Sequence, residues 1–218
     1  MQHWNATLLA LALAAPAFAA DPPAPGRILF QNVCAQCHGP NGEGNVAIKS
    51  PSIAGLPGWY LMAQIENFRA DRRGAHPQDP EGQLMRAISK ILNTEQTKQV
   101  VEYVSILPRQ GHEATLKVDL AAGRELFVER CMECHRYNGE GELVFGAAPL
   151  VGLQDWYLAS QLRKFQNGMR GAQKDDVNGQ KMVFSSGYIA DDATLKSVAA
   201  FVLTLPESTQ SAAGGFGK

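Results

Sequence analysis

One short motif occurs twice in this 218-residue chain, and it places the strongest constraint on the fold. The motif is Cys-x-x-Cys-His, at Cys34–His38 and again at Cys131–His135, and its two copies use all four cysteines. The copies are 97 residues apart, and a shift of 97 residues aligns positions 26–85 with positions 123–182 without a gap. Self-similarity over this length indicates a tandem duplication, so we expect two similar modules.

The spacing inside each motif is typical of c-type haem attachment. Two thiols three positions apart can add to the two vinyl groups on one edge of a porphyrin, and the adjacent histidine then reaches the iron. A redox dithiol or a zinc site would also use a Cys-x-x-Cys pair, but zinc would need ligands from both copies, which lie in separate repeats. We therefore predict two covalently bound haem c groups, attached through Cys34, Cys37, Cys131 and Cys134 and ligated by His38 and His135.

The second axial ligand should be present in both repeats. Met85 and Met182 lie 47 residues after His38 and His135, and among the methionines after residue 20 only these two correspond to each other. They are the predicted sixth ligands of the two irons. A thioether raises the reduction potential and fills the last position, which suits electron transfer rather than catalysis.

The N-terminus has the pattern of an export signal. An uncharged apolar run at positions 6–15 is followed by Pro16 and by the small-x-small sequence Ala17-Phe18-Ala19. We predict a signal peptide at residues 1–20 and a periplasmic mature protein. The alternative, a buried N-terminal helix, is disfavoured by the three prolines at positions 22–25. No other run approaches the ~18 apolar residues of a transmembrane helix, so the mature form should have none.

The remaining pattern is helical, with no convincing strand. The predicted helices are Gly26–Cys37, Trp59–Arg72, Glu95–Leu107, Ala121–Cys134, Trp156–Met169 and Ala193–Leu205. Asn93 or Thr94 should cap one of them and Asp191 or Asp192 another. The charged pairs Arg72-Arg73 and Asp175-Asp176 should lie on a solvated surface. Since Lys plus Arg (20) nearly balances Asp plus Glu (21), a nucleic-acid partner is not expected.

Taken together, the two motifs, the repeated Trp-Tyr-Leu-x-x-Gln segments and the paired methionines make the chain resemble a dihaem class I cytochrome c of the cytochrome c4 type. The resemblance implies an all-α fold with two tandem class I cytochrome c domains related by pseudo-twofold symmetry. With it, the expected boundaries are domain 1 at 21–109, a linker at 110–120, domain 2 at 121–207 and a flexible tail at 208–218.

The resemblance also implies details of the haem pockets. Pro51 matches the proline whose carbonyl accepts a hydrogen bond from the ligating histidine in such proteins. The second copy departs from this pattern, because it reads Ala148-Pro149 with the proline shifted by one position. Trp59 and Trp156 are expected in haem-pocket packing or in contacts between the lobes.

The function that the resemblance implies is transfer of single electrons between a quinol-oxidising complex and a terminal oxidase or reductase. The expected partners are therefore redox proteins, a quinol–cytochrome c reductase and a terminal oxidase, with transient association with membrane complexes. One alternative is a dihaem subunit that accepts electrons from a catalytic dehydrogenase. A dihaem peroxidase or a thiosulfate dehydrogenase is disfavoured, because both sites carry their methionine and no cysteine is spare. We do not expect an enzyme.

Overall fold

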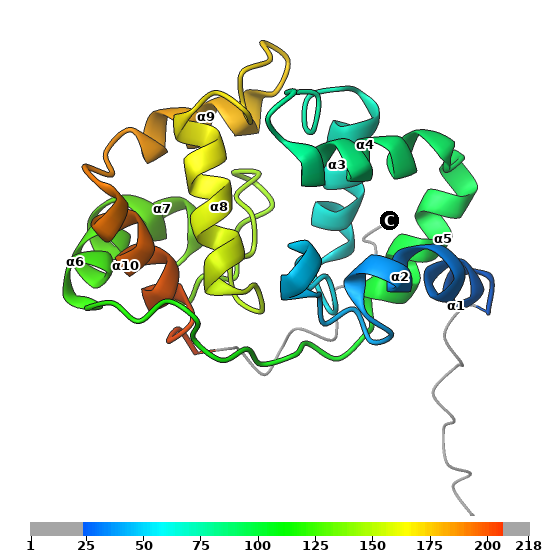
Figure 1. The fold of residues 1–218 in the computed structure, drawn as a ribbon, viewed down its shortest axis with the longest axis horizontal. Coiled ribbons are helices and arrows are strands. Elements are labelled where there is room, and N and C mark those ends of the chain that lie inside the picture. Colours follow the sequence, from blue (N-terminus) through cyan, green and yellow to red (C-terminus); the bar gives the residue numbers. More distant parts are fainter. Residues whose placement is uncertain (1–23, 207–218) are drawn as a thin grey trace, which may run out of the picture.

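The computed structural model of the protein describes residues 24–206, which form two helical modules side by side (Figure 1). Within these residues β-type pairing is limited to two isolated bridges, Asn45 with Ser50 and Glu142 with Ala147, at equivalent positions of the repeats. The prediction of an all-α chain with two tandem modules is confirmed. The predicted signal peptide (1–20) and tail (208–218) lie outside the described residues.

The two modules share one order of elements. The first contains α1 (Ala24–Leu29), the π-helical turn η1 (Phe30–Cys34), α2 (Ala35–His38), the 3-10 helix η2 (Val46–Ile48), α3 (Gly58–Arg69), α4 (Pro80–Ile91) and α5 (Thr94–Ser105). The second contains α6 (Ala121–Leu126), the π-helical turn η3 (Phe127–Cys131), α7 (Met132–His135), α8 (Asp155–Gln166), α9 (Val177–Ser186) and α10 (Asp192–Val202). Among residues 24–206 no helix is long and apolar enough to cross a membrane.

Side-chain caps begin the last helix of each module. Asn93 accepts a hydrogen bond from the backbone N–H of Gln96, whose side chain in turn accepts one from the backbone N–H of Asn93. Asp191 accepts from the backbone N–H of Thr194 at 2.7 Å. These bonds satisfy N–H groups that have no partner within the helix. Both capping predictions are confirmed.

Helices α4 and α9 were not expected from the sequence. Each has a glycine, a poor helix former, in its first turn and a large apolar residue, Leu84 or Phe184, exposed on its outer side. Their caps are Asp79 and Asp176, each of which accepts a backbone N–H bond of 2.9 Å from the glycine three positions later. These two helices matter for function because they carry Met85 and Met182.

Helices α3 and α8 end three residues before the predicted ends at Arg72 and Met169. The reason is a left-handed residue just after each helix, Asp71 (φ 60°) in the first module and Gly168 (φ 68°) in the second. A left-handed residue at this position reverses the chain and ends the helix.

In each module the first helix crosses the last one with a glycine at the crossing. Gly26 of α1 lies against the backbone of Gln99 in α5, and Gly123 of α6 lies against the backbone of Ser197 in α10. The N–H of Gly123 also donates to Ser197 Oγ at 2.7 Å. A Cβ at either glycine would overlap the facing backbone, so the close crossing requires glycine. This crossing fixes the helix that presents the haem motif.

We predict that Gly26→Ala and Gly123→Ala each lower the free energy of unfolding by about 1–3 kcal/mol, because the added methyl overpacks the crossing. Gly111→Ala is the control, since an added Cβ there has nothing within 4 Å. Thermal unfolding followed by far-ultraviolet circular dichroism measures all three. Equal stability of the crossing variants and the control would contradict the packing argument.

Candidate haem sites

Each Cys-x-x-Cys-His motif lies where the first helical segment of its module ends. Cys34 and Cys131 are half-buried, and Cys37 and Cys134 are exposed. Burial, with a smaller contribution from the second thiol, raises the pKa of Cys34 and of Cys131 to about 11. Among residues 24–206 no group of three or more His, Cys, Asp or Glu side chains is placed to hold a metal ion such as zinc.

The two motif histidines are buried and oriented by loop carbonyls. His38 and His135 are each 6% exposed. Nδ1 of His38 donates to Pro51 O at 2.8 Å, and Nδ1 of His135 donates to Ala148 O at 2.7 Å. With the proton held on Nδ1, Nε2 keeps its lone pair for a metal. Burial also lowers the pKa of both rings, which favours the neutral imidazole that ligation needs.

A largely apolar cavity adjoins each histidine. The first has a volume of about 650 Å³, and the second about 170 Å³. The predicted ligands that line the first cavity are Cys34, Cys37, His38 and Met85, and those that line the second are Cys131, Cys134, His135 and Met182. Each cavity thus brings two thiols, an imidazole and a thioether to one apolar space. This donor set, repeated in both modules, fits a haem c group in each.

The tryptophans of the two repeats are placed differently, and the position of Trp156 is compatible with both expected roles, packing in a haem pocket and contact between the lobes. Trp156 lines the cavity of the first module rather than that of its own, and Trp59 is not among the residues that line these two cavities. Tyr60 and Tyr157, which were not predicted, line both. They follow the tryptophans in the repeated Trp-Tyr-Leu segments. Their recurrence in both repeats could have identified them as pocket residues from the sequence.

The cavities meet at an interface built from equivalent residues of the two repeats. Arg73 donates to Gln64 Oε1 of its own module at 2.6 Å, and to Tyr157 Oη at 2.7 Å and Gln161 Oε1 at 3.0 Å in the other. Arg170 mirrors this arrangement with 2.9 Å bonds to Gln161 and to Gln64. Since Arg73 and Arg170 are 97 residues apart, the interface reproduces the symmetry of the repeat.

Two residues predicted to be on a solvated surface belong to the interior, so that prediction is wrong. Arg73 is 8% exposed and Asp176 is 6% exposed. Arg73 is buried because the second module covers it, and Asp176 because it caps α9. The burial of Arg73 depends on the docking of the two modules, which no local sequence window shows, whereas the cap at Asp176 involves a residue only three positions later.

The charge at this interface bears on what can bind there. Among the described residues, the side chains that accept hydrogen bonds from Arg73 and Arg170 in the interface are uncharged amides and phenols. Burial and the proximity of Arg73 lower the pKa of Arg170. Buried charges in proteins are normally neutralised by a partner. Haem c carries two propionate carboxylates, so the interface fits anionic groups of the two haems.

The two histidines differ in one hydrogen-bonding neighbour. Ser50 Oγ lies 3.1 Å from Nδ1 of His38, in addition to the Pro51 carbonyl. The equivalent residue in the second module is Ala147, which has no hydroxyl. A second acceptor on Nδ1–H makes the imidazole more basic and favours the oxidised iron. The two otherwise similar sites are therefore inequivalent.

We predict that Ser50→Ala raises the midpoint potential of the first haem and that Ala147→Ser lowers that of the second. Each shift should stay below about 60 mV, because one hydrogen bond contributes at most about 1.5 kcal/mol and 59 mV is a factor of ten for one electron. Spectroelectrochemical titration of both variants and the wild type measures the shifts. A shift of the same sign in both variants would contradict the argument.

Comparison with protein families and curated sequences gives consistent matches. One family model, described as cytochrome c, matches the chain twice, over residues 23–108 and 120–206. A thiosulfate dehydrogenase electron acceptor from Thiomonas intermedia (strain K12) is 32% identical over 178 residues, which is 76% of this chain and 75% of the relative. The Cbb3-type cytochrome c oxidase subunit CcoP of Azospirillum brasilense is 27% identical over 215 residues, 92% of this chain and 64% of that subunit.

Two solved structures are similar in fold to this chain. Reduced cytochrome c4 from Pseudomonas stutzeri has a TM-score of 0.68 and 25% identity, and the match covers 86% of this chain and 100% of that one. Thiosulfate dehydrogenase from Marichromatium purpuratum also has a TM-score of 0.68, with 30% identity over 85% of this chain. This chain spans 40% of that longer protein.

Proposed function

Because this chain belongs to the cytochrome c family, with one matching region in each half, we propose that it carries single electrons in the periplasm from a quinol-oxidising complex to a terminal oxidase or reductase. It is a dihaem, cytochrome c4-like electron carrier with two covalently bound haem c groups. The observation that carries the proposal is the repetition of one donor set around two cavities that meet at a common interface. This arrangement suits a relay that accepts an electron at one site and delivers it from the other.

In this proposal each module supplies every ligand of its own haem. Thioether bonds form at Cys34, Cys37, Cys131 and Cys134. Nε2 of His38 and Sδ of Met85 would ligate the first iron, and His135 and Met182 would ligate the second. Haem c supplies reversible one-electron chemistry between ferrous and ferric iron. With a histidine and a methionine as its two protein ligands, each iron would offer no site to a substrate, and we propose a carrier rather than a catalyst.

The other groups around each haem tune it. The carbonyls of Pro51 and Ala148 hold the histidine rings in one orientation, and the apolar walls keep water from the iron. The thioether favours the ferrous state and raises the potential. The corresponding domain assignment is residues 21–109 and 121–207, joined by a linker at 110–120.

We predict that Met85→Ala and Met182→Ala each remove about half of the weak near-infrared charge-transfer band of ferric iron bound to methionine sulfur, because each variant loses one of two such bonds. Each should also lower the potential of one haem. Met62→Ala is the control, since Met62 has no counterpart in the second repeat. A band that keeps its full intensity in either variant would show that the methionine assignment is wrong at that iron.

A second candidate function is electron acceptor for a dehydrogenase. It is favoured by the relative from Thiomonas intermedia, which is named as the electron acceptor of thiosulfate dehydrogenase. In this case the chain would receive electrons from an enzyme partner and pass them to an oxidase. The same two haem sites serve both candidates, so the donor distinguishes them.

Rapid mixing of the oxidised protein with each donor separates the candidates. We predict fast reduction by a quinol–cytochrome c reductase supplied with quinol, and reoxidation by a cbb3-type oxidase. If reduction instead requires thiosulfate dehydrogenase and thiosulfate, the second candidate is correct. Peroxide or thiosulfate turnover by the isolated protein at enzymatic rates contradicts both and identifies a catalyst.

A further inference from the structure

Two side chains of the second module contact the segments that support the axial ligands of the first haem. They are Lys164 and Gln154, on α8 and at its N-terminal end. Their partners are the cap of α4 and the loop that follows Pro51. The contacts join residues that are 102 and 85 positions apart in sequence, so they exist only because the modules are docked.

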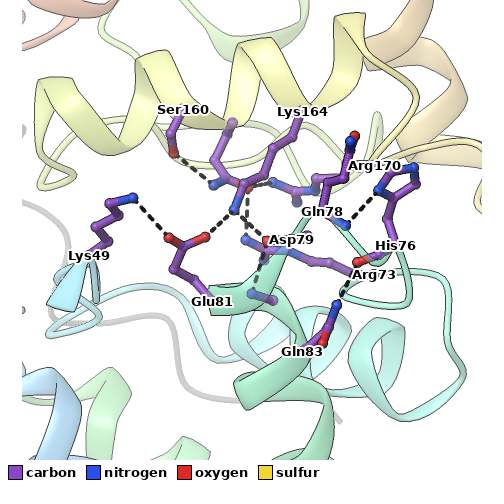
Figure 2. A network of polar contacts seen from close by, with 12 residues as sticks. Lys49, Arg73, His76, Gln78, Asp79, Glu81, Gln83, Ser160, Lys164 and Arg170 are labelled. Carbon is purple, nitrogen blue, oxygen red and sulfur yellow. Dashed lines mark hydrogen bonds and ion pairs between the residues drawn. The ribbon is translucent and has the colours of Figure 1, made fainter.

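The first contact is a nearly buried ion pair at the start of α4 (Figure 2). Lys164 Nζ lies 2.5 Å from Asp79 Oδ1 and 3.3 Å from Glu81 Oε2. The side chains of Lys164 and Asp79 are 15% and 3% exposed. Asp79 is the residue that caps α4 through the N–H of Gly82. Lys164 therefore holds in place the first turn of the helix that carries Met85.

The second contact holds the loop beside the histidine. Gln154 Oε1 accepts a hydrogen bond from the N–H of Ser52 at 2.9 Å, and its Nε2 donates to the carbonyl of Glu43 at 2.9 Å. Ser52 directly follows Pro51, whose carbonyl accepts from His38. Gln154 thus joins the two ends of the loop that orients the axial histidine.

The first module does not provide the equivalent contacts. The counterparts of Gln154 and Lys164 are Pro57, which has no side-chain donor, and Asn67, whose Oδ1 accepts from Arg72 Nε within the first module. Within residues 24–206, no lysine or arginine of the first module pairs with Asp176, the cap of α9.

An ion pair does run in the reverse direction, but it lies at the surface. Arg72 is paired with Asp175, whose side chain is 68% exposed. Exposed pairs contribute little to stability. The segments that carry the ligands of the first haem are therefore held more firmly by the other module than those of the second haem.

We propose that Lys164 and Gln154 of the second module are positioning residues that keep Met85 and His38 on the first iron, whereas the segment that carries Met182 receives from the first module only the exposed Arg72–Asp175 ion pair. The proposal rests on the ligands assigned under Proposed function. It follows that the two irons exchange their methionine for an external ligand with different ease. The second iron should exchange first.

Imidazole titration of the oxidised, full-length protein tests this. Imidazole nitrogen replaces the methionine sulfur on the iron with no change in oxidation state, and loss of the near-infrared band reports the exchange. In the wild type we expect two phases, with the tighter one at the second haem. Met85→Ala and Met182→Ala assign the phases, because each removes one of them.

The decisive variants alter Lys164 and Gln154 themselves. Lys164→Gln should raise the imidazole affinity of the first haem about tenfold and leave the second unchanged, because it removes one partner of a nearly buried ion pair. Lys164→Arg should restore most of the wild-type affinity. Lys49→Gln is the matched control, since it removes a cation paired with Glu81 but not one that contacts Asp79. Gln154→Ala should also raise the imidazole affinity of the first haem, as Lys164→Gln does.

Asn67→Lys offers a test that does not depend on removing a contact. It places a lysine at the position equivalent to Lys164, where Asn67 and Asp176 line the same cavity, and it should lower the imidazole affinity of the second haem. Unchanged affinity of the first haem in Lys164→Gln, or an equal change at both haems, would overturn the proposal. If Met85→Ala and Met182→Ala remove no phase, the ligand assignment fails instead.

Discussion

The rest of each module is arranged around a hydrogen bond between a buried histidine and a loop carbonyl, because this bond fixes both the haem motif and the loop that covers it. The loop returns to the histidine through further backbone bonds: Gly44 N–H donates to the carbonyl of His38 at 2.7 Å, and Gly141 N–H donates to that of His135 at 3.0 Å. Gly44 and Gly141 have φ values of 86° and 77°, and a Cβ at either would press on the facing backbone. The repeated Asn-Gly-Glu-Gly segment is therefore a turn required by this geometry.

The interface between the modules contains some contacts that both repeats make and others that only the second module makes. Arg73 and Arg170 make equivalent bonds in both directions, so they connect the two cavities in the same way. The contacts of Lys164 and Gln154 have no such equivalents. A duplicated chain can thus keep two similar redox sites and still distinguish them, because substitutions at the interface affect one site through the other module.

Several features of the fold were predictable because they depend on short sequence distances. The motif spacing, the gap-free repeat and the caps at Asn93 and Asp191 involve residues close in sequence or related by one constant shift. Helices α4 and α9 were missed because each carries a glycine, a poor helix former, in its first turn and exposes a large apolar residue on its outer side. Met85 and Met182 were nevertheless identified as candidates, since their correspondence between the repeats does not depend on secondary structure.

The sequence by itself determined that the chain is a duplicated, haem-binding helical protein, because covalent attachment requires two thiols and an imidazole at a spacing that one helical turn provides. Only the tertiary structure decided what lies between the modules. It buried Arg73, which looked like a surface residue, and directed Trp156 into the cavity of the first module. It also brought Lys164 to Asp79, 85 residues away. Such contacts depend on how two complete surfaces fit together, and no local pattern of residues encodes that fit.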